Sequence, residues 1–233
     1  MRIAHLLETS LIDYPGRVAA VLFTAGCNFR CPFCHNAELV LPEKVSELRL
    51  LDPDEVLAFL AERRGFLDGL VVTGGEPTIQ DDLDAFLAGV KGLGLLVKLD
   101  TNGARPDVLE ALLGEKLLDY VAMDVKAPFG RYPEFAGVEV DLRAIQESIC
   151  LIRERAPDYE FRTTVAPGLR VEDLRAIAGL LAGAKRWFLQ PFVVPEGKRL
   201  VNPRWETALG LSRIDLHALW RDFAPRFSGG GVR

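Results

Sequence analysis

Three cysteines fall within eight residues near the amino terminus, at positions 27, 31 and 34. This spacing lets Cys27, Cys31 and Cys34 reach one inorganic centre, and iron–sulfur clusters are held by closely spaced thiolates. A [4Fe–4S] cluster held by three thiolates leaves one iron open for a substrate or cofactor. The alternative is a structural zinc site completed by His35 or His5. Zinc sites usually take ligands from two separate elements, however, and no second cysteine pair follows in this chain.

The fourth cysteine, Cys150, stands alone in an amphipathic segment, residues 145–152. Unpaired cysteines are commonly buried, where they behave as small hydrophobic side chains. We therefore expect Cys150 to be buried in the core and to take no part in the chemistry.

The composition is that of an ordinary globular protein. The 233 residues are 49% hydrophobic and 26% charged, with a formal net charge of −5. Lysine and arginine are dispersed, which argues against nucleic acid as a partner. The sequence shows neither a membrane span of about 20 apolar residues nor a signal peptide, so we expect a cytoplasmic protein. We predict one domain over residues 1–227 and a flexible, glycine-rich tail over residues 228–233.

Short apolar runs alternate with longer amphipathic stretches along the chain. The runs predicted as strands are residues 18–24, 70–73, 95–99, 120–125, 160–165 and 187–192. The stretches predicted as helices are residues 53–64, 81–90, 106–113, 142–155, 171–181 and 212–220. Six strand–helix units with short connections imply parallel strands joined by right-handed crossovers. Because a complete barrel has eight such units, the predicted fold is an α/β, open, partial (β/α)6 barrel.

Polar motifs follow the predicted strands. The cysteines follow the first strand, Gly-Gly-Glu-Pro at 74–77 the second, Asp-Thr-Asn-Gly at 100–103 the third and Asp-Val-Lys at 124–126 the fourth. In such sheets the loops after the carboxyl ends of the strands form the active face, so these motifs are expected to meet at one site. Taken alone, Gly-Gly-Glu-Pro could be only a turn, and Asp124 with Lys126 could be only a salt bridge at a strand end.

The cysteine spacing, with aromatic Phe33 before the last cysteine, resembles the signature of the radical S-adenosylmethionine (SAM) superfamily. This resemblance implies a [4Fe–4S] cluster whose open iron binds the amino and carboxylate groups of SAM. One electron from the reduced cluster then splits the sulfonium bond, which yields methionine and a 5′-deoxyadenosyl radical. A reduced flavodoxin or ferredoxin is implied as the electron donor, because no cysteines remain for an internal relay cluster.

The resemblance extends to the later motifs. The cofactor-binding residues that it implies are Phe33, Gly74, Gly75, Glu76, Asp100, Asn102, Asp124, Lys126 and Gln190. Glu76 is expected to hold the methionyl amine and Lys126 the carboxylate. Asp100 and Asp124 are expected at the methionyl end of the cofactor, together with a monovalent cation. Lys126 and Arg162 are expected to be catalytic.

One motif departs from the pattern of some glycyl-radical activases, which carry a histidine shortly after a proline of the sixth strand. Here the residues after Pro191 are Phe192, Val193 and Val194. The contacts to adenosine are therefore expected to differ, with Gln190 as the substitute.

The sequence around the cysteines narrows the resemblance. Residues 10–17 (Ser-Leu-Ile-Asp-Tyr-Pro-Gly-Arg), residues 23–26 before Cys27, and His35-Asn36 after Cys34 resemble the anaerobic ribonucleoside-triphosphate reductase activating proteins. The reaction implied is removal of a hydrogen atom from a glycine Cα of a partner reductase, which leaves a glycyl radical. Two alternatives stay open: a small-molecule radical enzyme similar to 7-carboxy-7-deazaguanine synthase, and a non-catalytic zinc or iron–sulfur module.

Overall fold

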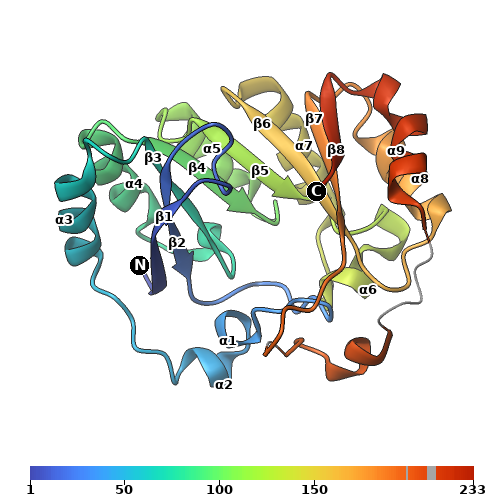
Figure 1. The fold of residues 1–233 in the computed structure, drawn as a ribbon, viewed down its shortest axis with the longest axis horizontal. Coiled ribbons are helices and arrows are strands. Elements are labelled where there is room, and N and C mark those ends of the chain that lie inside the picture. The colour runs from blue at the N-terminus through green and yellow to red at the C-terminus, as the bar shows by residue number, and fades with distance from the viewer. Residues whose placement is uncertain (198, 209–213) are drawn as a thin grey trace.

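A computed structural model describes residues 1–197, 199–208 and 214–233 of the chain. Its single sheet has the spatial order β1-β2-β3-β4-β5-β6-β7-β8. The strands are β1 (Ile3–Ser10), β2 (Ala19–Thr24), β3 (Gly69–Gly74), β4 (Leu96–Thr101), β5 (Tyr120–Asp124), β6 (Tyr159–Val165), β7 (Arg186–Pro191) and β8 (Gly229–Val232). β2 to β8 are parallel, whereas β1 is antiparallel to β2. Figure 1 shows β1 and β8 at the two edges of a curved, open sheet, which confirms the predicted fold class.

The sequence does not predict two of these strands, β1 and β8. In β1 only Ile3 and Ser10 are buried, so this edge strand lacks the apolar run that marks the central strands. β8 contains three consecutive glycines and pairs with β7 along residues 186–189. The prediction of a flexible tail over residues 228–233 is therefore wrong. A glycine-rich backbone keeps its hydrogen-bonding groups, and an adjacent strand edge satisfies them.

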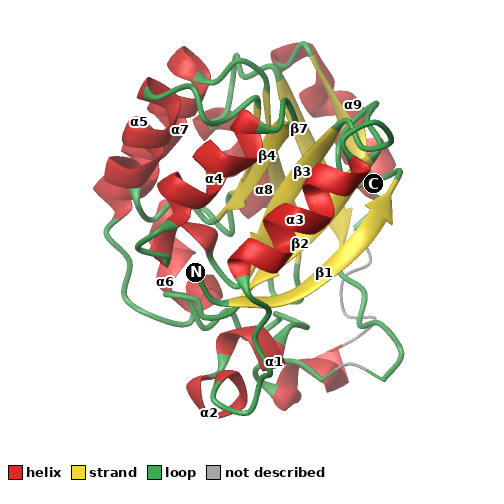
Figure 2. Cartoon of the chain, turned by 90° about the vertical axis from the view of Figure 1, so that its left-hand side faces the viewer, coloured by secondary structure: helices red, strands yellow, loops and turns green. Residues whose placement is uncertain are grey.

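Helices cover the outer face of the sheet, as Figure 2 shows for α3, α4, α5 and α7. The α-helices are α1 (Ala37–Val40), α2 (Pro42–Val45), α3 (Pro53–Arg63), α4 (Leu83–Gly92), α5 (Pro106–Gly114), α6 (Tyr132–Ala136), α7 (Leu142–Arg155), α8 (Val171–Leu180) and α9 (Leu216–Phe223). Asp52 caps α3 by accepting a hydrogen bond from the Asp54 amide, and Asp141 caps α7 by accepting one from the Arg143 amide.

Five of the predicted helices agree with α3, α4, α5, α7 and α8 to within about two residues. The helix predicted over residues 212–220 begins at Leu216 in the structure, because Asp215 caps it by accepting a hydrogen bond from the Ala218 amide. Residues 212 and 213 of that prediction lie outside the described residues. No helix in the described part of the chain is long and apolar enough to cross a membrane.

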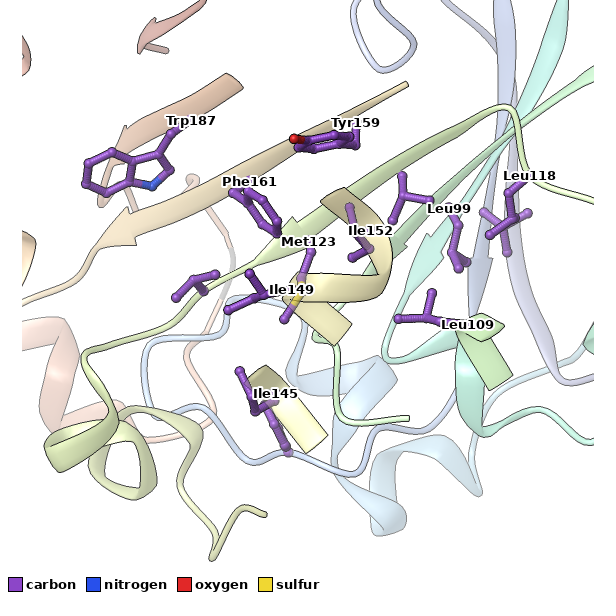
Figure 3. Close-up of a cluster of buried hydrophobic side chains, with 14 of the residues drawn as sticks. Leu99, Leu109, Leu118, Met123, Ile145, Ile149, Ile152, Tyr159, Phe161 and Trp187 are labelled. Atoms are coloured by element: carbon purple, nitrogen blue, oxygen red, sulfur yellow. The ribbon is translucent and has the colours of Figure 1, made fainter. Parts of the chain in front are cut away.

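The two faces of the sheet differ in character. The outer face and the helices share one large hydrophobic core, and Figure 3 shows Ile145, Ile149 and Ile152 of α7 in it together with Met123 and Phe161 of the strands. The inner, concave face has a small apolar cluster near the amino ends of the strands, formed by Tyr14, Ala19, Val21, Val71, Tyr120 and Ala122. Toward the carboxyl ends of the strands this face becomes polar, and the sequence motifs gather there.

Candidate active site

One cavity of about 310 Å³ lies at the carboxyl ends of the strands. Every site residue predicted from the sequence lines it: Cys27, Cys31, Phe33, Cys34, Gly74, Gly75, Glu76, Asp100, Asn102, Asp124, Lys126, Arg162 and Gln190. These residues come from the last positions of β3, β4 and β5, from the segments that follow β2 to β5, and from β6 and β7 themselves. Parallel strands end at one edge of the sheet, and this brings together side chains that are up to 163 positions apart in the sequence.

The cysteines lie on the segment that follows β2, residues 27–34, here called the cysteine loop. Its conformation is held mainly by backbone groups: the Phe29 amide donates to Cys27 Sγ (3.3 Å) and the Cys34 amide donates to the Cys31 carbonyl (3.0 Å). The Arg30 amide donates to the Ala136 carbonyl at the end of α6 (2.8 Å). The loop therefore has a defined shape that its own peptide groups maintain.

All three thiols of the cysteine loop are withdrawn from solvent, with Cys31 only 8% exposed and Cys27 and Cys34 half-buried. Burial, together with the nearby Glu76 carboxylate, raises the pKa of the Cys27 thiol to about 12. Burial likewise raises the pKa of Cys31 to about 11 and raises that of Cys34. Among the described residues, no three His, Cys, Asp or Glu side chains are gathered closely enough to hold a single metal ion, as a structural zinc site would require.

A carboxy-terminal segment covers the cysteine loop. The Val201 amide donates to the Cys34 carbonyl (2.9 Å) and the Asn202 amide donates to the Pro32 carbonyl (3.1 Å). The Phe33 ring lies 6.1 Å from the Trp205 ring, within the range of favourable aromatic pairs. Segments about 170 residues apart in the sequence are thus joined beside the cavity.

The glycines after β3 allow two loops to touch. The Gly75 amide donates to the Thr24 carbonyl (2.9 Å) and the Glu76 amide donates to the Gly26 carbonyl (2.8 Å). A Cβ atom on Gly75 would lie 1.9 Å from the Gly26 carbonyl oxygen. Gly74 has a φ of +117°, which side chains disfavour. The motif needs glycine because its backbone packs directly against the segment that leads into the cysteine loop.

Glu76 is buried, with 1% of its surface exposed, and it joins β3 to β4. Its Oε1 accepts hydrogen bonds from the Thr78 amide (3.1 Å), the Thr78 hydroxyl (2.6 Å) and the Thr101 hydroxyl (2.7 Å). Its Oε2 accepts one from the Asn102 amide (2.7 Å). Burial raises the pKa of Glu76, although these donors oppose the shift. Asn102 also donates to the Asn28 side chain (2.7 Å), so the chain of contacts continues into the cysteine loop.

Five charged side chains form a continuous ion-pair network at the ends of β4, β5 and β6, here called the charge network: Lys98, Asp100, Arg162, Asp124 and Lys126. Arg162 bridges the two carboxylates, with its Nη1 3.0 Å from Asp100 Oδ2 and its Nε 2.9 Å from Asp124 Oδ1. Lys126 Nζ lies 3.0 Å from Asp124 Oδ2, and Lys98 pairs with Asp100 Oδ1. The salt bridge between Asp124 and Lys126 that the sequence left open is therefore present, and both side chains still line the cavity.

The charge network keeps its members ionised. Burial alone would raise the pKa values of Asp100 and Asp124, but the Arg162 guanidinium, with Lys98 at Asp100 and Lys126 at Asp124, holds both below their usual range. In the same way, Asp124 raises the pKa of Lys126 against the effect of burial. The carboxylates and the basic groups stabilise one another, as buried charges require.

Other residues around the cavity were missed in the sequence. Phe29, Asn36, Val40 and Thr73 also line it. Phe29 lies within the cysteine motif, and Asn36 and Thr73 lie next to the cysteine and glycine motifs, so their positions in the sequence are a usable signal. Val40 reads as a core residue of a short helix, and nothing in its type indicates a cavity.

Cys150 differs from its prediction. The structure places this thiol on the exposed side of α7, 3.6 Å from Gln146 Nε2. The helix buries the neighbouring Ile149 and Leu151 against the core instead. The apolar pattern of residues 145–152 is real, but Cys150 falls on its polar side, so the expected burial is wrong.

Curated relatives carry similar sequences. A protein of Methanocaldococcus jannaschii, whose name assigns it provisionally to the glycyl-radical enzyme activating enzymes, is 37% identical over 199 residues, which is 82% of this chain and 79% of that protein. The pyruvate formate-lyase-activating enzyme of Staphylococcus aureus is 31% identical over 134 residues, 52% of each chain. The 7-carboxy-7-deazaguanine synthase of Hyperthermus butylicus is 33% identical over 103 residues, 40% of this chain and 38% of that enzyme.

The fold is also similar to solved structures. The crystal structure of Streptococcus suis SuiB matches 91% of this chain with a TM-score of 0.66 and 14% sequence identity. This chain spans about half the length of that protein, 48%. At this identity the match concerns the fold alone. Within the sequence, residues 21–181, which include the cysteine loop and the charge network, match the profile of the radical SAM superfamily. The chain belongs to the radical SAM superfamily.

Proposed function

We propose that this radical SAM enzyme is an activase, which generates a glycyl radical on a partner protein. The observation that carries the proposal is that three cysteine thiols and four members of the charge network, Asp100, Asp124, Lys126 and Arg162, line one cavity at the carboxyl ends of the strands. The relative with 37% identity over 82% of the chain is named for glycyl-radical enzyme activation, which supports this reaction over others of the superfamily.

The donor set fits a [4Fe–4S] cluster. Cys27, Cys31 and Cys34 supply three soft sulfur ligands on one loop, whose backbone already donates to Cys27 Sγ. When bound, such a cluster supplies the electron for reductive cleavage of SAM to methionine and the 5′-deoxyadenosyl radical. The cysteine loop buries the three sulfurs, and the segment with Val201 and Trp205 shields it from water.

The charge network suits the methionyl end of SAM. It contains three basic and two acidic groups, so it carries one surplus positive charge. Lys126 lies at one end of the network and lines the cavity. An ammonium group has three donors, so Lys126 can bind a carboxylate while it keeps its bond to Asp124. We assign to Lys126 the SAM carboxylate, and to Arg162 the alignment of both aspartates with the cofactor.

The remaining cofactor contacts follow from position. Gly74 and Gly75 present backbone to the cavity, and Gln190 lines it at the end of β7, where we assign it to adenosine. Glu76 accepts four hydrogen bonds from its own chain, about as many as a carboxylate offers. It would therefore exchange one of these bonds in order to accept the methionyl amine.

The proposed protein substrate is a glycyl-radical enzyme similar to an anaerobic ribonucleotide reductase. Its glycine Cα would give a hydrogen atom to the 5′-deoxyadenosyl radical, which leaves 5′-deoxyadenosine and the glycyl radical. The proposed electron donor is a reduced flavodoxin or ferredoxin. The resemblance also implies a monovalent cation beside Asp100 and Asp124, the two aspartates that the charge network pairs with basic side chains.

The first experiment tests the radical chemistry. The chain is reconstituted anaerobically with iron and sulfide, reduced with dithionite in the presence of SAM, and assayed for 5′-deoxyadenosine. Wild type is expected to produce it, and Cys31→Ala is not. Cys150→Ala is the matched control, because it removes an exposed thiol far from the cavity in sequence. A wild-type chain that holds an intact cluster but cleaves no SAM would leave the non-catalytic module as the better explanation.

The second experiment tests the substrate. The reduced, SAM-loaded chain is mixed with a glycyl-radical reductase, and electron paramagnetic resonance records the doublet of a glycyl radical. A glycine-to-alanine variant of the reductase should give no signal. Turnover of a small deazapurine precursor with no glycyl radical would favour the alternative, which the 33% identity over 40% of the chain supports less strongly.

A further inference from the structure

A buried lysine underlies the wall of the cavity. Lys98 lies on β4 with its side chain only 2% exposed, next to Tyr120 on β5, whose ring is 6.0 Å from the ammonium nitrogen. Within the described part of the chain it forms an ion pair with Asp100, two residues ahead on the same face of the strand. Lysine is among the residues least often fully buried, and it stays so only when paired. Lys98 therefore has a partner that accounts for its charge.

Asp100 receives a positive charge on each oxygen. Lys98 pairs with Oδ1, and Arg162 Nη1 lies 3.0 Å from Oδ2. The Asp100 side chain is itself only 14% exposed, so its ionised form requires positively charged groups in contact with it. Asp124 is paired in the same way, by Arg162 at 2.9 Å and Lys126 at 3.0 Å. Both aspartates of the cavity wall are thus matched by basic groups of the chain itself.

We infer that Lys98 is a positioning residue, an internal cation that fixes Asp100 for the cofactor and makes a bound monovalent metal ion at these carboxylates unnecessary. The inference rests on the proposed role of Asp100 at the methionyl end of SAM. A metal ion at this place would exchange with the medium, whereas an ammonium on a β-strand stays at a fixed position. The lysine also supplies the surplus positive charge of the network, because Arg162 and Lys126 alone would only balance the two aspartates.

The test compares SAM binding in different salts. Cluster-loaded wild type, Lys98→Met and Lys98→Arg are titrated with SAM in potassium chloride, sodium chloride and choline chloride at equal ionic strength. Binding is followed by calorimetry and by the electron paramagnetic resonance spectrum of the reduced cluster. Wild type should bind equally in all three. Lys98→Met should bind about 10-fold to 100-fold more weakly in choline, the usual cost of losing an orienting partner. Potassium or sodium should restore the SAM affinity of Lys98→Met in a saturable manner. Lys98→Arg should bind SAM as wild type does without either ion.

The matched control is Lys91→Met. Lys91 pairs with Asp119 at 2.6 Å, and this lysine–aspartate pair lies outside the residues that line the cavity. Its loss should leave SAM affinity and salt dependence as in wild type. A saturable requirement of wild type for potassium or sodium would overturn the inference, as would a Lys98→Met chain whose affinity equals that of wild type in choline.

A second readout needs no cofactor. Thermal unfolding of the cluster-free chains should show Lys98→Met less stable than wild type in choline and partly restored by potassium, because Asp100 would otherwise lack one of its partners. Equal melting of the two chains in every salt would contradict the internal cation. This measurement separates the role of Lys98 from the proposed activase function. The glycyl-radical assay can fail while Lys98 still behaves as inferred, and it can succeed while Lys98→Met melts like wild type.

Discussion

The cysteine loop and the charge network lie at the same cavity, but they are held in different ways. The cysteine loop is ordered by backbone hydrogen bonds and by glycine contacts, and its three thiols, one buried and two half-buried, have raised pKa values. The charge network is ordered by ion pairs among its own side chains, which keep its carboxylates ionised.

This difference indicates which part of the site is complete without a ligand. Buried thiols favour the protonated form, so a cluster must displace protons as the thiolates bind iron, and cluster binding is coupled to proton release. The charge network has already satisfied its charges within the chain. We therefore expect variants of the loop to fail mainly in cofactor loading, and variants of the network to fail mainly in stability and SAM affinity.

The largest expected effect is that of Cys31→Ala. This substitution removes one of three ligands and leaves a small, compatible side chain, so the chain should fold but should not retain a [4Fe–4S] cluster. Iron and sulfide content after reconstitution should fall to the background, and 5′-deoxyadenosine with it. Circular dichroism should show an unchanged fold. A stable, SAM-cleaving cluster in Cys31→Ala would mean that another side chain replaces the thiol.

The next effect is that of Arg162→Met, which should destabilise the chain by about 3 to 5 kcal/mol, the cost of leaving buried charges without a partner. Arg162 is the one member of the network that contacts both Asp100 and Asp124, so its loss exposes the carboxylates to each other's charge. Urea unfolding measures the change. Cluster content after reconstitution should stay near that of wild type, which would separate the role of the charge network from that of the cysteine loop.

The control for Arg162→Met is Arg155→Met. Arg155 pairs with Glu110 at 2.8 Å, but both side chains are about half exposed. Exposed ion pairs contribute only about 0 to 1 kcal/mol. If the two variants lost the same stability, the network would be no more than a set of surface pairs.

Much of this site could be predicted from the sequence, because cysteine spacing, paired glycines and charges after apolar strands carry chemical meaning on their own. The six central strands were recognisable from their apolar runs, and parallel pairing then places every motif at one edge. The residues that escaped prediction lack such a signal. Lys98 interrupts an apolar strand, and a lysine there is expected to face solvent. Only the structure shows that it is buried and paired with Asp100.

Other features depend on contacts between distant segments. β8 forms because β7 offers a free strand edge, and the side chain of Arg233 then pairs with buried Glu160 at 2.8 Å. Neither the strand nor this ion pair can be predicted from the glycine-rich composition of the segment. For Gly75, the residue type is evident from the motif but the reason for it is not, since the atom that crowds a Cβ there belongs to Gly26, 49 positions earlier.

The third prediction concerns Gly75→Ala. Its Cβ would lie 1.9 Å from the Gly26 carbonyl oxygen, and a backbone atom cannot rotate away as a side chain can. We expect a loss of stability of about 3 kcal/mol, at the upper end of the cost of overpacking, together with poorer cluster retention because the cysteine loop must shift. Gly114→Ala is the control: its Cβ would meet nothing within 4 Å, so stability should stay level or rise slightly. Equal cluster retention in both variants would contradict a link between this glycine and the loop.

The smallest effect, on the order of 1 kcal/mol, is a difference in pH dependence between Asp124 of the charge network and Glu76, which accepts hydrogen bonds but has no basic partner in this network. Asp124 has a folded pKa below its ordinary value of 3.8, so its contribution is present above that pH and is lost as the pH falls through the folded pKa. Glu76 has a folded pKa above its ordinary 4.5, so its contribution is present below that pH and is lost as the pH rises through the folded value.

Urea unfolding of the cluster-free chain between pH 3 and 7 separates these opposite slopes. The stability difference between wild type and Asp124→Asn should shrink as the pH falls below about 3.8, because the unfolded wild-type chain then binds a proton at Asp124 while the folded chain keeps this carboxylate charged. Glu76→Gln mimics the neutral form, so wild type should lose stability relative to it as the pH rises above 4.5. Parallel pH profiles for the three chains would show that the two carboxylates share one environment, and the conclusion that ion pairs within the charge network keep Asp124 ionised would then be wrong.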